Sequence, residues 1–191
     1  MNDHVVYFYE EQRDLMDRLM EFVKQGLKAA EKVCIIATEA HRAELQTRLM
    51  AEHLIGPSAS TTGGHYVPLD ASTTLSLFMY QWWPNERMFL NAMDSLLGPQ
   101  TQGHVVRIYG EMVGVLVADG NDLAAIQLER LWTKFLTRTT QNCSLLCGYD
   151  RLEFQVSTRQ FTLNQICACH DETVGRPSLP SPSTNEPPSF Q

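Results

Sequence analysis

Short apolar runs alternate with longer amphipathic stretches along most of the chain. Short, mainly apolar runs at 5–9, 33–37, 66–69, 105–109 and 143–147 predict β-strands. The run Val33-Cys34-Ile35-Ile36-Ala37 has no polar position, which is typical of a strand buried on both faces. Between the runs, helical periodicity predicts helices over 12–28, 40–53, from 72, 84–97, from 112, 121–139 and 157–169.

This alternation of strands and helices predicts the fold class. Repeated βαβ units imply an α/β fold, a three-layer sandwich with a mainly parallel sheet and helices on both faces. We expect one domain over residues 1–172, with a loop at 56–64. Residues 173–191 are rich in Pro and Ser, which predicts a disordered tail because so little apolar surface is available for burial.

Composition narrows the class of protein further. The 191 residues carry a net charge of −7 and show no cluster of Lys or Arg, which argues against direct binding of nucleic acid. No apolar run reaches the roughly 18–20 residues that a membrane span requires, and the first residues do not resemble a signal peptide. We therefore expect a cytoplasmic protein without a membrane partner. Composition leaves the oligomeric state open, homo-oligomers included.

Five cysteines raise the question of disulfides or a metal. An odd count without a secretion signal favours reduced thiols. Cys143 and Cys147 lie on one predicted strand about 13 Å apart, too far to share an ion. Cys167, Cys169 and His170 match no usual zinc spacing. The sequence thus predicts small buried side chains at these positions, with no metal site and no cofactor.

Polar residues follow most of the predicted strands, where the ligands of open α/β sheets bind. The candidates are Tyr9, Glu10, Thr38, Glu39, Glu111 and Tyr149, with His41 nearby. A phosphate-binding loop after the first strand would require glycines and a Lys-Ser/Thr pair, and two carboxylates stand there instead. Because no nucleophile motif such as G-x-S-x-G occurs either, we expect a binding protein and not an enzyme.

Two further ligand candidates lie outside the strand ends. His4 precedes the first predicted strand, which places it at the opposite edge of the sheet unless the chain folds back. Arg107 interrupts an apolar strand, and a buried Arg requires a partner, for which Glu111 or Glu10 is suitable. Arg107 is thus a structural ion-pair residue, a ligand contact, or both. Trp82 and Trp83 are expected to anchor a loop onto the core or over the pocket.

Several of these residues together resemble the MEDS domain (methanogen/methylotroph, DcmR sensory domain). The resemblance covers roughly residues 4–172 and rests on the following motifs: His4-x4-Tyr9-Glu10, Phe22-x3-Gly26-Leu27, Glu31-Lys32-Val33, Arg107-x-x-Gly110-Glu111-Met112, Leu146-Cys147-Gly148-Tyr149-Asp150, Phe154 and His170. The chain departs from the family pattern where Asp171 takes the place of the usual proline after the closing histidine.

The resemblance implies a RecA/KaiC-like core without the Walker A loop, in a domain that senses small molecules such as hydrocarbon derivatives. Related domains are coupled to helix-turn-helix or histidine-kinase outputs. Since no such module is present here, we expect the signal to pass to a separate kinase or transcription regulator. The alternatives are a ligand-free protein-interaction regulator and a degenerate nucleotide-processing enzyme.

Overall fold

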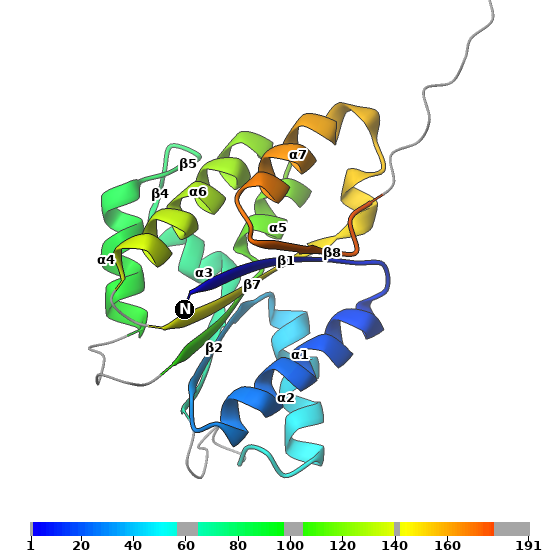
Figure 1. The fold of residues 1–191 in the computed structure, drawn as a ribbon, viewed down its shortest axis with the longest axis vertical. Helices are drawn as coiled ribbons and strands as arrows, with labels where there is room; N and C mark the ends of the chain where they lie inside the picture. Colours follow the sequence, from blue (N-terminus) through cyan, green and yellow to red (C-terminus); the bar gives the residue numbers. More distant parts are fainter. Residues whose placement is uncertain (1, 57–64, 98–104, 140–141, 178–191) are drawn as a thin grey trace, which may run out of the picture.

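A six-stranded parallel sheet forms the centre of the molecule in the computed structural model, which describes residues 2–56, 65–97, 105–139 and 142–177. The strand order is β3-β2-β6-β7-β1-β8 (Figure 1). The strands are β1 (Asp3–Tyr9), β2 (Lys32–Ala37), β3 (His65–Asp70), β6 (Val106–Gly110), β7 (Cys143–Asp150) and β8 (Glu172–Val174). The expected α/β fold is therefore confirmed.

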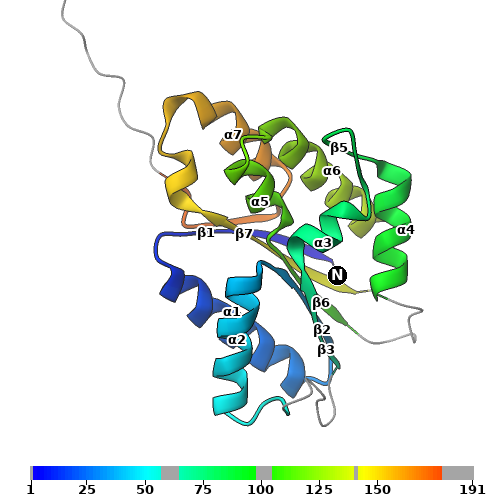
Figure 2. The ribbon, with the colours of Figure 1, turned by 180° about the vertical axis from the view of Figure 1, so that it is seen from behind.

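Helices cover both faces of this sheet and complete a three-layer sandwich. One face carries α1 (Gln12–Lys28) and α2 (Glu39–Ala51), as Figure 1 shows. The other face carries α3 (Ala71–Ser76), α4 (Glu86–Leu97), α5 (Met112–Ala118), α6 (Asp122–Arg138) and α7 (Gln160–Ala168). Figure 2 shows the same two layers of helices with the molecule seen from behind. This division follows from right-handed crossovers: connections toward β3 pass over one face, and connections toward β8 pass over the other.

The apolar core is split by the sheet into two parts. Because side chains alternate along a strand, each central strand contributes to both parts. In β7, Leu145 and Cys147 pack toward α5 and α6, whereas Leu146 packs toward α1. In β1, Phe8 faces α6 and Tyr9 faces the α1–α2 side. This alternation decides which polar residues can meet.

Some boundaries differ from the predicted ones. The first strand begins at Asp3, so His4 lies inside it and not ahead of it. Pro84 does not open a helix, because it belongs to the short strand β5 (Trp83–Pro84), and α4 begins at Glu86. β8 was not expected: its three residues pair with β1 at the start of the predicted tail. Residues 57–64 of the predicted loop and the tail beyond residue 177 lie outside the described residues.

The tryptophan pair occupies a two-stranded hairpin formed by β4 (Met79–Tyr80) and β5. Gln81 and Trp82 form its turn and both have positive φ, at 49° and 66°, a conformation that ordinarily favours Asn and Gly. The Trp82 side chain is 85% exposed, so the expectation that it anchors a loop onto the core is wrong. The turn is instead attached through its backbone, because the Trp82 carbonyl accepts a hydrogen bond from the Asn121 side chain at 2.8 Å.

None of the helices in the described segments is long and apolar enough to cross a membrane.

Candidate functional site

Four side chains gather where β1, β2 and β6 end, on the face covered by α1 and α2. We call Tyr9, His41, Tyr109 and Glu111 the edge cluster. β2 and β6 are neighbours in the sheet, but the helices that follow them lie on opposite faces, and the same is true of β1 and β7. In open α/β sheets such switch points are where ligands bind.

Glu111 is the centre of the edge cluster and is 4% exposed. Its Oε2 accepts the backbone N–H of Thr38 at 2.7 Å, and its Oε1 accepts the Tyr109 hydroxyl at 2.8 Å. His41 Nδ1 forms a short hydrogen bond with the same Oε1. The ring of Tyr9 lies edge-on to His41 with 6.4 Å between ring centroids.

The charges of this cluster are coupled. Burial raises the pKa of Glu111, but the hydrogen bond and charge of His41, followed by the Thr38 N–H, outweigh it, so the pKa is lowered. Burial likewise lowers the pKa of His41, and the hydrogen bond and charge of Glu111 reverse the shift, so this pKa is raised. The pair is therefore an imidazolium and a carboxylate over a wider pH range than the free side chains allow.

The ion pair predicts a pH-dependent stability. The contribution of His41 is present below its unfolded pKa of about 6.5 and is lost as the pH rises through its higher folded value. The contribution of Glu111 is present above about pH 4.3 and is lost as the pH falls through its lower folded value. We expect His41→Gln to lower the free energy of unfolding by about 2 kcal/mol near pH 5.5, and by less above pH 8. Urea titrations across this range measure the difference.

His53→Gln is the matched control, because His53 is exposed at the end of α2. It should leave the free energy of unfolding within about 0.5 kcal/mol of the wild-type value at every pH. A His41→Gln effect that is the same at all pH values would contradict the ion pair.

A second group of polar side chains lies on the opposite face of the sheet, between it and helices α6 and α7. This buried cluster consists of His4, Glu129, Cys147, Tyr149 and His170. Glu129 has no exposed surface, and its Oε1 accepts the Tyr149 hydroxyl at 2.6 Å. Burial lowers the pKa of His170, so its imidazole is neutral at neutral pH. Burial also raises the pKa of the Cys147 thiol.

The predicted site residues therefore divide into separate groups. Tyr9 and Glu111 lie in the edge cluster, and the backbone N–H of Thr38 donates to Glu111 there. His4 and Tyr149 lie in the buried cluster, since their positions in β1 and β7 point to the other face of the sheet. Glu10 is exposed and pairs with Arg151 at 3.0 Å, and Glu39 is exposed in the first turn of α2.

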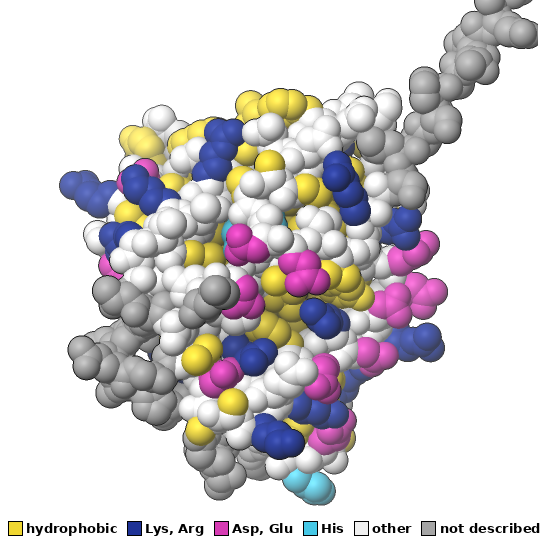
Figure 3. Space-filling view, viewed as in Figure 1, with side chains coloured by type: hydrophobic (Ala, Val, Ile, Leu, Met, Phe, Trp, Pro, Cys, Tyr) yellow, Lys and Arg dark blue, Asp and Glu magenta, His cyan; other side chains and the backbone are white. Residues whose placement is uncertain are grey.

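Arg107 lies toward the start of β6 and takes part in neither cluster. Its partner is Glu31, not Glu111 or Glu10 as predicted, because the Arg107 side chain extends along the α1 face, away from the strand ends. The guanidinium also lies over the Phe22 ring, 5.3 Å from its centroid. It borders a cavity of about 190 Å³ whose lining includes Val5, Phe22, Leu146 and Arg18. Figure 3, viewed as Figure 1, shows hydrophobic side chains near the centre of the molecule, with acidic and basic groups around them.

Some residues of the two clusters were absent from the predicted site. His41 comes four residues after the end of β2, so its position in the sequence already placed it near the ligand-binding edge of the sheet. Glu129 carried a weaker signal: it occupies the apolar stripe of α6 with Ala125, Leu128 and Trp132, where a carboxylate requires partners. Cys147 and His170 were set aside because their spacing in sequence does not reveal that they meet.

The connection between β1 and α1 excludes the usual phosphate-binding loop. Only Glu10 and Glu11 separate Tyr9 from the first residue of α1, and neither is glycine or lysine. The protein is thus an α/β domain with two largely buried clusters of polar side chains and no P-loop after its first strand.

Comparison with known proteins assigns this domain to a family. The model of the MEDS family (MEthanogen/methylotroph, DcmR Sensory domain) matches residues 3–171. The chain belongs to the MEDS family, which confirms the resemblance found in the sequence and supports a sensory role. No curated protein and no solved structure is detectably similar to the chain.

Proposed function

We propose that this sensory domain binds a small organic molecule at the edge cluster and acts by binding alone, without catalysis. The observation that carries the proposal is the state of His41. Its Nδ1 is held by Glu111, and within the described parts of the chain no residue accepts a hydrogen bond from Nε2. The His41 side chain is 15% exposed, and its ring lies edge-on to the Tyr9 ring.

The cluster favours a particular ligand chemistry. An imidazolium oriented by a buried carboxylate is a fixed hydrogen-bond donor, which suits an oxygen atom of a ligand, and an adjacent aromatic edge suits a short apolar group. A small oxygenated hydrocarbon derivative, such as an alcohol or a carboxylate, has both features. Glu10 and Glu11 disfavour a polyphosphate at the neighbouring turn because like charges repel.

The cavity beside Arg107 is a second candidate location. Its volume of about 190 Å³ is below the usual range for drug-sized ligands but is large enough for a molecule of a few heavy atoms. Arg107 is already paired with Glu31, whereas His41 Nε2 has no hydrogen-bond partner in the described parts of the chain. The edge cluster is therefore the better candidate for the ligand site.

We propose further that the signal passes to a separate protein, a kinase or a transcription regulator. The β4–β5 hairpin supports this relay, because exposed aromatic side chains on a strained turn are typical of interaction sites. Tyr80, Trp82 and Trp83 are 63%, 85% and 46% exposed. The same surface would serve a ligand-free interaction regulator, which is the alternative function.

A thermal-shift screen tests the proposal. The panel comprises C1–C4 alcohols, aldehydes, carboxylates and amines, with Mg-ATP as a separate arm. We expect at least one organic compound to raise the melting temperature of the wild-type protein by about 5–10 °C at saturation. His41→Gln, measured against its own ligand-free baseline, should abolish this increase, and Arg107→Gln should retain it.

Each other outcome has a defined meaning. An increase lost only in Arg107→Gln would move the ligand to the cavity on the α1 face. A panel without any stabilising compound would contradict ligand sensing and favour the interaction regulator. Stabilisation by Mg-ATP would contradict the exclusion of phosphate ligands at the β1–α1 turn.

A further inference from the structure

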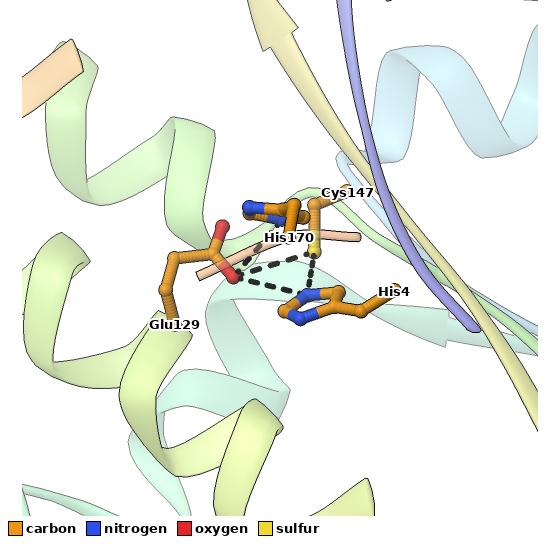
Figure 4. Close-up of side chains that lie close together, drawn as sticks. All are labelled: His4, Glu129, Cys147 and His170. Carbon is orange, nitrogen blue, oxygen red and sulfur yellow. Dashed lines mark hydrogen bonds and ion pairs between the residues drawn. The ribbon is translucent and has the colours of Figure 1, made fainter. Parts of the chain in front are cut away.

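The buried cluster brings four potential metal ligands to one point. They are His4 from β1, Glu129 from α6, Cys147 from β7 and His170, which follows α7 (Figure 4). Their donor atoms all lie within 4.8 Å of one another. No pair among these residues is closer than 18 positions in sequence, so only the tertiary fold assembles them.

The donor separations fit a tetrahedral ion. His4 Nε2 lies 3.4 Å from Cys147 Sγ and 3.3 Å from Glu129 Oε2. Glu129 Oε2 lies 3.6 Å from Cys147 Sγ and 3.5 Å from His170 Nε2. Zinc bonds of about 2.0–2.3 Å to nitrogen, oxygen and sulfur give tetrahedral edges of roughly 3.3–3.8 Å. Four of the six donor separations already have nearly this value, and the other two are within 4.8 Å.

Neighbouring groups orient two of the ligands, His170 and Glu129, as in known metal sites, whereas the buried Nδ1 of His4 has no hydrogen-bond partner among the described residues. His170 Nδ1 is hydrogen-bonded to the carbonyl of Ile166 at 2.7 Å, which requires a proton on Nδ1 and leaves a lone pair on Nε2. That Nε2 is fully buried, points at Glu129 and has no hydrogen-bond partner in the described structure. Tyr149 holds the second carboxylate oxygen of Glu129, so Oε2 remains directed at the centre of the cluster.

A divalent ion would also balance the charge of these four ligands. Two neutral imidazoles, one carboxylate and one thiolate carry a total charge of −2, which a divalent ion neutralises inside an apolar core. Binding would release the Cys147 proton to solvent. A donor set of two nitrogens, one sulfur and one oxygen in tetrahedral arrangement is typical of zinc.

We propose that His4, Glu129, Cys147 and His170 form a closed zinc site. Four protein ligands leave no open position, so the ion has a structural or regulatory role and not a catalytic one. It would tie the first strand to the segment after α7, and so couple metal occupancy to the position of α7 and β8. The site is on the opposite face of the sheet from the edge cluster and does not depend on the proposed ligand.

Cobalt substitution tests this site on the full-length protein. Metal-stripped protein is titrated with Co²⁺ and followed by absorption spectroscopy, and bound zinc is measured by elemental analysis. We expect one ion per chain, a thiolate-to-cobalt charge-transfer band and the intense visible bands of a tetrahedral site. Cys147→Ser should abolish the charge-transfer band. Cys143→Ser, a substitution of another buried cysteine on the same strand, should retain it.

Measurements on the wild-type protein test the zinc site without relying on variants that could fail to fold. Zinc in excess should raise the melting temperature of the stripped protein by about 10 °C, and X-ray absorption at the zinc edge should give one sulfur and three light-atom ligands. Absence of stoichiometric binding to the wild-type protein would overturn the proposal. A charge-transfer band that persists in Cys147→Ser, or two sulfur ligands at the zinc edge, would also overturn it.

Discussion

Glu129→Ala is expected to lower the free energy of unfolding by about 4 kcal/mol. The carboxylate has no exposed surface and is the common partner of Tyr149, His4, His170 and Cys147. Its removal leaves the buried Tyr149 hydroxyl without an acceptor, removes the carboxylate that contacts His4 and His170, and opens a cavity in the stripe of α6. Urea denaturation followed by circular dichroism measures the loss.

Two further variants test whether the loss in the free energy of unfolding is specific to Glu129 or follows the removal of any glutamate. Glu86→Ala removes a glutamate whose side chain is 47% exposed and is paired with Lys134, so it should cost less than about 0.5 kcal/mol. Glu129→Gln keeps an acceptor for Tyr149 and should recover roughly half of the loss. Equal losses for Glu129→Ala and Glu86→Ala would show that the buried cluster does not stabilise the fold.

Gly148→Ala is the second substitution with a large expected effect. A Cβ at this position would lie 2.3 Å from the Tyr109 hydroxyl and 2.9 Å from two carbons of its ring. Tyr109 is fully buried and hydrogen-bonded to Glu111, so the ring cannot move aside without breaking the edge cluster. We expect the free energy of unfolding to fall by about 3 kcal/mol, with a smaller pH dependence as the His41–Glu111 pair is disturbed.

Gly110→Ala provides the control for this substitution. Gly110 is also in a central strand, but a Cβ there would meet only Leu145 Cδ1, at 4.0 Å. Its effect should remain below about 1 kcal/mol. If Gly148→Ala proved equally mild, the packing of Tyr109 across β7 would have to be looser than the structure indicates.

These two predictions concern the two faces of the sheet. Glu129 is the central residue of the buried cluster under α6 and α7. Gly148 leaves space for Tyr109, which donates a hydrogen bond to Glu111 in the edge cluster under α1 and α2. Ligand binding at one cluster and metal binding at the other would both involve β1, which carries Tyr9 of the edge cluster and His4 of the buried cluster. A comparison of ligand-induced stabilisation with and without zinc would measure any coupling between them.

Most of the fold could be predicted from the chain alone. The parallel sheet and the helix on each crossover follow from hydrophobic periodicity, which depends only on local sequence. The short elements were harder, because two or three residues carry no period: β8 was placed in the tail, and Pro84 was placed in a helix. In both places pairing with a distant or adjacent strand, rather than local preference, decides the structure.

The site could be predicted only in part, and the reason is geometric. Sequence position placed Tyr9, Thr38 and Glu111 at one edge of the sheet, because parallel strands all end there. It did not show on which face each side chain lies. Phe8 and Tyr9 are adjacent in sequence, yet their side chains lie on opposite faces of the sheet. A shift of one residue would therefore move a side chain from the face of one cluster to the face of the other.

The sequence by itself determined the α/β class, the absence of a phosphate loop after the first strand and the membership of the MEDS family. Tertiary structure decided which polar groups meet. His4, Glu129, Cys147 and His170 are separated by up to 166 positions, and their convergence depends on strand order and on the docking of α6 and α7. Spacing along a chain limits contacts only within a helix or strand, so a site built from four elements becomes visible only when those elements are packed.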